Sequence, residues 1–171
     1  DPAARVAALE QFLQLPKLPG AIASAARRQL VTAFVKQNPV SASKRAERLA
    51  KKTNGDEKAR IWQTLSTELL TAKQPGPALD AARRAVQVRG TRQPHLAQEA
   101  LGQALRANTQ TAEARQAFES ALRASPSSSV SASALAEMAE AEGRTADVLA
   151  LRAHAFLARP GKEAWDRLTA A

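Results

Sequence analysis

The stretch ALGQALRANTQTAEARQAFESALRASP, Ala100–Pro126, divides into two short helical segments joined by the polar sequence NTQT. In the second segment, Ala114, Phe118, Ala121 and Pro126 follow one another at offsets of four, three and five residues. Offsets of three and four place side chains on one face of a helix, and the proline ends the helix because it lacks a backbone N–H. The stretch therefore predicts a helix hairpin.

The same spacing occurs on both sides of this hairpin, at steps of 36 and 34 residues. The matching second-helix sets are Ala78, Ala82, Ala85 and Gly90 before it, and Val148, Arg152, Ala155 and Pro160 after it. Upstream of each set lies a first-helix quartet: Trp62, Leu65, Ser66 and Leu69, then Gln98, Leu101, Gly102 and Leu105, then Ala132, Leu135, Ala136 and Ala139. The third member is small, which allows the two helices of a hairpin to cross closely. Such a period is typical of repeat arrays in which each hairpin covers its neighbour's apolar face. The alternative is a generic antiparallel helix bundle in which the equal spacing is a coincidence.

At these positions the sequence resembles the bacterial tetratricopeptide repeat (TPR) family. Its unit is a helix–turn–helix of roughly 34 residues, with Trp, Leu and Gly positions in the first helix and Ala, Phe, Ala and a closing Pro in the second. The resemblance implies an all-α fold, a right-handed α-solenoid of antiparallel helix hairpins with about nine helices, in a single superhelical domain over residues 1–171. It assigns repeats to 59–94, 95–128 and 129–162, a degenerate hairpin to 19–58, and capping helices to 1–15 and 162–171.

The helix boundaries follow from capping residues and breaks. Asp1 precedes a proline at the first helical position, which favours a helix that runs to about Leu15. Ser41 and Asp56 are expected to cap the third and fourth helices. In the last helix, Trp165 and Leu168 are expected to pack against the open end of the array.

Composition narrows the possible environments. The chain has no cysteine, which excludes disulfides and thiolate metal sites. No apolar run approaches the roughly 20 residues that span a bilayer, so no membrane insertion is expected. The chain does not begin with Met, and we expect a processed protein or a segment of a larger one.

Catalytic constellations are missing from the sequence. His95 and His154 are the two histidines, they fall in different repeats, and neither has a carboxylate at metal-ligand spacing. Phosphate-binding glycine loops are absent. Glu137 and Glu140 share a helix face that we expect to meet water. The segment is predicted to be non-enzymatic, with no catalytic residue, no metal ligand and no cofactor.

The TPR resemblance implies a concave groove lined by the first helix of each hairpin. The implied groove positions are polar and of mixed charge, without a concentrated carboxylate-binding set. They are Arg60, Gln63, Thr67 and Thr71 in one repeat, Glu99, Gln103 and Arg106 in the next, and Ser133 and Glu137 in the third.

Positive charge is concentrated in the first half of the chain. Residues 1–90 contain 16 Lys/Arg and 7 Asp/Glu, whereas residues 91–171 contain 9 of each. Such asymmetry is typical of proteins with an anionic partner, although a solvated helix face is the plainer interpretation. The densest part of the cluster at 27–60 is Lys44, Arg45, Arg48, Lys51 and Lys52.

Three functions remain open. The first is a protein-interaction scaffold that binds a peptide or partner protein in the groove. The second is a periplasmic TPR segment of an envelope polysaccharide-export or cell-wall assembly protein, with a polysaccharide partner. For this function we expect a periplasmic or cell-envelope location, and the alternative location is the cytoplasm. The third is nucleic-acid binding through the 27–60 cluster, which is disfavoured for single strands because Phe34 alone interleaves the basic run.

Overall fold

The computed structural model describes residues 1–169, and residues 170–171, at the end of the expected capping helix 162–171, lie outside the described part. Within residues 1–169 the fold is all-α, with ten helices against the expected number of about nine and no β-strand. The helices are α1 (Pro2–Phe12), α2 (Gly20–Gln37), α3 (Pro39–Lys51), α4 (Gly55–Thr71), α5 (Pro75–Val86), α6 (Pro94–Ala107), α7 (Thr111–Ala124), α8 (Ser129–Ala141), α9 (Thr145–Ala158) and α10 (Lys162–Thr169).

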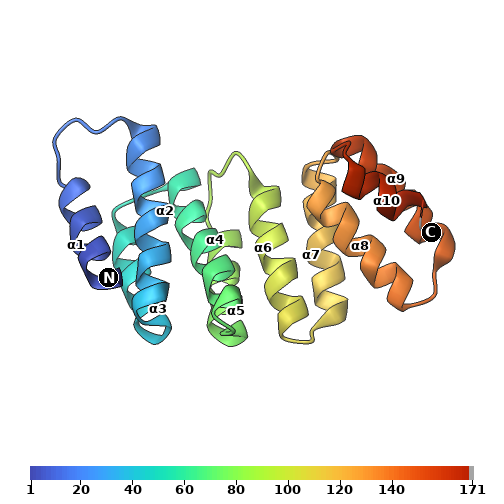
Figure 1. The fold of residues 1–171 in the computed structure, drawn as a ribbon, viewed down its shortest axis with the longest axis horizontal. Coiled ribbons are helices and arrows are strands. Elements are labelled where there is room, and N and C mark those ends of the chain that lie inside the picture. The colour runs from blue at the N-terminus through green and yellow to red at the C-terminus, as the bar shows by residue number, and fades with distance from the viewer. Residues whose placement is uncertain (170–171) are drawn as a thin grey trace. The chain divides into compact units, whose positions relative to one another are not determined.

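The helices form antiparallel hairpins, which are clearest for α4–α5, α6–α7 and α8–α9 (Figure 1). The chain divides into two compact units, unit 1 at Asp1–Gln93 and unit 2 from Pro94 onward. In unit 1, α2 packs against α1, α3 and α4, and α4 also packs against α3 and α5. In unit 2, α7 packs against α6 and α8, and α9 packs against α8 and α10. The expectation of a single domain over 1–171 stays a prediction.

The three hairpin turns repeat one backbone conformation at the predicted steps. Lys73, Thr109 and Gly143 adopt positive φ angles of 57°, 60° and 71°. The residue after each donates its backbone N–H to a carbonyl five positions back, at 2.8 Å for Gln74, 3.0 Å for Gln110 and 2.9 Å for Arg144. These helix ends carry the left-handed residue that is common after a helix. The 36- and 34-residue steps are therefore present in the backbone as well as in the side-chain pattern.

The small first-helix position sets the helix separation in the central hairpin. Gly102 of α6 is buried against Phe118 of α7, which is fully buried. A Cβ atom on Gly102 would lie 2.7 Å from the Phe118 Cε1 atom, closer than real Cβ contacts allow. The corresponding positions in the neighbouring hairpins are Ser66 and Ala136, which are also buried. The predicted close crossing is confirmed, and in this hairpin the ring of one helix occupies the space that the other leaves.

Alanine forms much of the core. The exposed fraction of Ala42, Ala46, Ala78, Ala82 and Ala121 is at most 1%. Small side chains allow close helix contact, while a few larger ones supply most of the apolar area. The largest fully buried apolar side chains are Phe118, Ile61, Leu65, Leu69 and Val31.

Three helix boundaries differ from the expectation. The third helix begins at Pro39 rather than after Ser41, because Asn38 caps it and its Oδ1 accepts the backbone N–H of Val40 at 3.0 Å. A first-turn proline suits this position, since its missing N–H is not needed there. The fourth helix begins at Gly55, which leaves Asp56 inside the first turn.

The first helix is shorter than expected. Asp1 caps it as predicted, through a 2.9 Å hydrogen bond from the Ala3 backbone N–H, but the helix ends at Phe12 instead of about Leu15. Leu15 lies beyond the helix and is 53% exposed. Without a buried partner for Leu15, the last turn gains little from tertiary packing, which supplies most helix stability.

Candidate functional site

A hollow of about 710 Å³ lies in unit 2, and we call it the unit 2 groove. Its lining comes from α6, α8, α9 and α10, with one residue from α7 and three from the turn before α10. Four of the nine predicted groove residues line it, namely Gln103, Arg106, Ser133 and Glu137. The first helices α6 and α8 therefore present these side chains to one common space.

The floor of the unit 2 groove is apolar. Phe118, Ala134 and Ala155 are buried residues that line it, and Val130 lines it with 43% of its surface exposed. Val130 is one of the few large apolar side chains left open to water in unit 2. The floor can therefore receive an apolar side chain from a ligand.

Two ion pairs join helices beside the unit 2 groove, and Arg106, Glu137 and Arg152 are the members of these pairs that line it. The Arg106 guanidinium of α6 donates to the Glu137 carboxylate of α8 at 2.9 Å. The Arg152 guanidinium of α9 donates to the Glu140 carboxylate of α8 at 2.7 Å and to the backbone carbonyl of Arg167 at 2.9 Å. Glu137 and Glu140 are exposed, as expected, with 57% and 60% of their side-chain surface open to water, and each carboxylate also pairs with an arginine.

Arg152 occupies the position where the central hairpin has Phe118. The side chain is 15% exposed, so its charge is largely removed from water and needs both of its partners. Its bond to the Arg167 carbonyl ties α10 to α9 beside the groove. A substitution that departs from the TPR pattern thus replaces aromatic packing with a polar link to α10.

Three cations along the C-terminal wall of the groove have no ion-pair partner within residues 1–169, and they are Arg159, Lys162 and Arg167. They come from the turn after α9 and from α10. The sequence prediction missed them because it placed groove residues on the first helices of three repeats only. The sequence RPGK at 159–162, a turn flanked by two cations, is the signal that identifies this wall.

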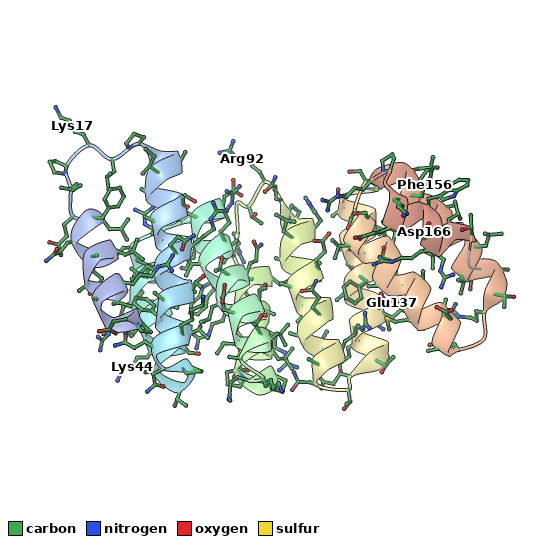
Figure 2. The ribbon with its side chains drawn as sticks, in the orientation of Figure 1. Lys17, Lys44, Arg92, Glu137, Phe156 and Asp166 are labelled. Carbon is green, nitrogen blue, oxygen red and sulfur yellow. The ribbon has the colours of Figure 1, made fainter. Side chains whose placement is uncertain are left out.

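The last helix contributes less apolar packing than expected. Trp165 is 54% exposed and contacts Phe156 of α9 edge-on, with ring centroids 5.7 Å apart. Figure 2 labels Phe156 on α9. Leu168 is half-buried, and no residue of α10 is fully buried. Helix α10 is held by the Phe156–Trp165 contact and the Arg152 link rather than by a buried face.

Glu99, a fifth predicted groove residue, serves to join hairpins. Its Oε1 atom accepts hydrogen bonds from the hydroxyls of Ser128 and Ser131, at 2.5 Å and 3.5 Å. Ser128 also caps α8, because its Oγ accepts the Ser131 backbone N–H at 3.1 Å. Glu99 therefore fixes the start of α8 against α6.

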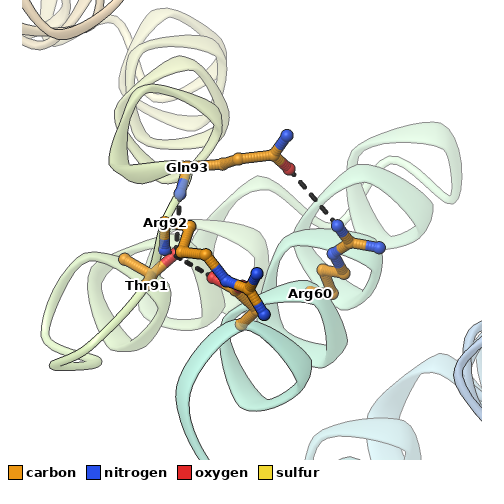
Figure 3. A network of polar contacts seen from close by, with 5 residues as sticks. Arg60, Thr91, Arg92 and Gln93 are labelled. Atoms are coloured by element: carbon orange, nitrogen blue, oxygen red, sulfur yellow. Dashed lines mark hydrogen bonds and ion pairs between the residues drawn. The ribbon is translucent and has the colours of Figure 1, made fainter. Parts of the chain in front are cut away.

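The remaining predicted groove residues, Arg60, Gln63, Thr67 and Thr71, lie on α4 in unit 1. Arg60 donates to the Gln93 side chain at 3.3 Å (Figure 3). Gln63 is half-buried, whereas Thr67 and Thr71 are exposed. The Thr71 hydroxyl donates to the Thr67 carbonyl within the same helix. The structure groups these four along one helix of unit 1.

Asp56 binds Arg92, a residue of the polar network that Figure 3 shows together with Arg60 and Gln93. Its carboxylate accepts the Arg92 backbone N–H at 2.6 Å and the Arg92 Nε–H at 3.0 Å. These contacts lower the pKa of the Asp56 carboxyl, the backbone hydrogen bond most of all, with a further contribution from Thr91. The predicted cap residue instead connects α4 to the loop that precedes Pro94.

The basic cluster lies on α3 and just beyond its end. Lys44, Arg48, Lys51 and Lys52 are exposed, and Arg45 is half-buried. Arg45 lies over the Phe34 ring at 4.1 Å and pairs with Glu10 at 3.4 Å, and Lys51 pairs with Glu47 at 3.5 Å. The five cations are therefore close in space as well as in sequence.

Residues 1–169 contain no group of three or more His, Asp or Glu side chains placed to hold a metal ion. His154 makes a hydrogen bond through Nε2 to the Pro126 carbonyl, which is a structural contact. None of the helices in this range is long and apolar enough to cross a membrane.

Two solved structures are similar to this chain along almost its whole length. YrrB, a TPR protein with an unusual peptide-binding site, matches with a TM-score of 0.63 and 19% identity over 96% of this chain and 80% of YrrB. MamA matches with a TM-score of 0.63 and 14% identity over 97% of this chain and 90% of MamA. The resemblance to TPR proteins is therefore confirmed for the fold, which is an α-solenoid of helix hairpins. No protein-family model and no curated protein matches the sequence.

Proposed function

We propose that the protein is a non-catalytic protein-interaction scaffold that binds an acidic peptide segment of a partner protein in the unit 2 groove. The observation that carries the proposal is the chemistry of this groove. An apolar floor at Val130 and Ala134 lies beside three cations without ion-pair partners among residues 1–169, namely Arg159, Lys162 and Arg167. They outnumber Glu163, the carboxylate that lines the same wall. A segment that alternates acidic and apolar side chains complements both parts.

The fold supports a scaffold in a second way. Binding sites of helical repeat proteins are extended surfaces rather than enclosed reaction chambers. The similarity to YrrB, a protein with a peptide-binding site, agrees with a peptide ligand but does not identify it. Paired side chains such as Arg106 and Glu137 fix the groove wall, while the unpaired cations are available to a ligand.

The test is fluorescence anisotropy with a labelled peptide of alternating Glu and Leu residues and with a Lys and Leu peptide as its control. We expect the acidic peptide to bind and the basic peptide not to bind. The double variant Arg159→Glu/Lys162→Glu should weaken acidic-peptide binding roughly tenfold, since exposed charge pairs contribute up to about 1 kcal/mol each.

A matched control changes the same charge elsewhere. Arg123 and Arg83 are exposed and do not line the groove. The variant Arg123→Glu/Arg83→Glu should retain the affinity of the unsubstituted protein. Equal loss in both variants, or no binding of the acidic peptide, contradicts the proposal.

The cell-envelope setting and a polysaccharide partner stay predictions. The unit 2 groove offers little stacking area for a sugar ring, because its aromatic residue Phe118 is fully buried. For this reason we favour a peptide over a glycan as the ligand of this groove.

A further inference from the structure

Helix α3 has one exposed cationic face. Its buried side is formed by Ala42, Ala46 and Ala50, which pack inward. At 3.6 residues per turn, five cations span about 120° of the helix circumference on the opposite side. We call these residues the α3 face, and they are Lys44, Arg45, Arg48, Lys51 and Lys52. The one acidic residue of α3, Glu47, lies outside this arc.

A hollow lies on each side of α3. The first, of about 340 Å³, lies between α3 and the helices α1 and α2, and Arg48 and Lys52 line it. The second, of about 510 Å³, lies between α3 and the helices α4 and α5, and Lys58 and Arg89 line it. Helix α3 therefore forms a ridge between two hollows, and both hollows belong to unit 1.

Several of these cations have no counter-charge. Arg48, Lys52, Lys58 and Arg89 make no ion pair within residues 1–169. Lys51 and Arg84 share one carboxylate, Glu47, at 3.5 Å each. The ridge and its two hollows thus carry a surplus of positive charge that no group in unit 1 neutralises.

We propose that this surface binds double-helical DNA, with α3 in the major groove and the two flanking phosphate backbones over the two hollows. An α-helix with its side chains is about 10–12 Å wide, and the major groove of B-DNA is about 12 Å wide. Two of the free cations, Arg48 and Lys52, belong to the α3 face and line the first hollow, and the other two, Lys58 and Arg89, line the second hollow, so each backbone would pass a pair of them. Contacts of this kind position DNA without reading its sequence.

The neighbouring aromatic rings disfavour single strands. Phe34 and Trp62 are buried, and the guanidinium groups of Arg45 and Arg84 lie over their rings at 4.1 Å and 4.9 Å. These rings therefore present no open stacking platform for an unpaired base, which single-strand binding normally uses. A flat membrane surface can meet the α3 ridge but not Lys58, which is half-buried in the second hollow. The proposal also favours the cytoplasmic alternative over the cell-envelope location.

The experiment measures anisotropy of a labelled DNA duplex of roughly 20 base pairs, two helical turns, between about 50 and about 200 mM salt. We expect binding that weakens steeply with salt. Each lost phosphate contact reduces the slope of log affinity against log salt by about 0.9. The variant Arg48→Glu/Lys52→Glu/Lys58→Glu/Arg89→Glu should therefore lose about 3–4 from that slope, besides losing affinity.

The matched control reverses four exposed cations of unit 1 that line neither hollow: Lys17→Glu, Arg28→Glu, Lys36→Glu and Lys73→Glu. It changes the net charge equally and should keep the slope within about one unit of the unsubstituted value. Circular dichroism of both variants checks that each is folded. Equal loss of slope in both variants overturns the proposal, because the binding is then a general effect of net charge.

Two further ligands test the shape of the surface. Double-stranded RNA of the same length carries similar charge, but its deep and narrow major groove does not admit a helix. We expect it to bind at least tenfold more weakly than DNA. Equal binding of RNA, stronger binding to vesicles of anionic phospholipid, or no binding of DNA contradicts the proposal. Groove variants such as Arg159→Glu lie in unit 2 and should leave DNA binding unchanged, so this proposal and the peptide proposal fail independently.

Discussion

The substitution Gly102→Ala probes the close crossing of α6 and α7. The added Cβ would lie 2.7, 2.8 and 2.9 Å from three atoms of the Phe118 ring, and Phe118 is fully buried, so the ring has little room to move. Overpacking of this kind costs about 1–3 kcal/mol, while replacing glycine in a helix returns up to about 1 kcal/mol. We expect a net loss of about 1–2 kcal/mol in the free energy of unfolding.

The sign of the effect should reverse when the ring is absent. Phe118→Ala alone should cost about 3–5 kcal/mol through the cavity that it leaves. In that background Gly102→Ala no longer meets the ring, and it should stabilise the protein by up to about 1 kcal/mol through helix propensity. The neighbouring hairpin already holds small residues at both positions, Ser66 and Ala82, and both are buried.

The assay is urea unfolding monitored by circular dichroism for the two single variants and the double variant. Gly76→Ala is the control, because a Cβ on Gly76 would meet nothing within 4 Å. Its effect should be neutral or slightly stabilising. If Gly102→Ala behaves like Gly76→Ala, or keeps its destabilising effect beside Phe118→Ala, the ring contact does not set the helix separation.

Three further predictions concern single contacts. The ionised Asp56 carboxylate stabilises the folded state above about pH 4, its pKa in the unfolded chain, and this stabilisation is lost as the pH falls through the lower pKa of the folded state. Unfolding curves of Asp56→Asn measured at several pH values should lack that acid-dependent loss. If Asp56→Asn shows the same pH profile as the unsubstituted protein, the assignment to Asp56 is wrong. Thr109→Gly should raise the free energy of unfolding by about 1 kcal/mol, because glycine adopts the φ of 60° without steric cost, as Gly143 does in the equivalent turn. If thermal unfolding shows that the variant is destabilised, the backbone at Thr109 is not strained. Arg152→Ala should remove the link to α10 and lower the free energy of unfolding by roughly 1–3 kcal/mol. Hydrogen exchange across residues 162–169 should become faster. Unchanged exchange would mean that the Trp165 contact alone holds the helix.

The sequence predicted the hairpins because their signals are local and repeated. The small residue Gly102 recurs in register as Ser66 and Ala136 in the other repeats, and its contact with Phe118 gives a steric reason for it to be small. The left-handed turn residue at 143 is a glycine, the residue type most common in this conformation after a helix. Lys73 and Thr109 adopt the same conformation, but neither residue type indicates it.

The boundaries and the binding surfaces were harder to predict because they depend on distant partners. Ser41 and Asn38 are both good cap residues, and only the following proline favours Asn38. Asp56 was read as a cap, whereas its partner Arg92 lies 36 residues away. Ion pairing likewise decides which cations stay free, so the sequence could not separate Arg159 from the paired Arg152.

The most direct test of the account is chemical-shift mapping of the isotope-labelled protein during titration with the alternating Glu and Leu peptide. We expect shifts at Gln103, Ser133, Ala155 and Lys162, which line the unit 2 groove from α6, α8, α9 and α10. Exposed positions of α7 such as Arg123 should not respond. Shifts confined to α7 or to unit 1, or an unchanged spectrum at saturating peptide, contradict a scaffold that binds its partner in this groove.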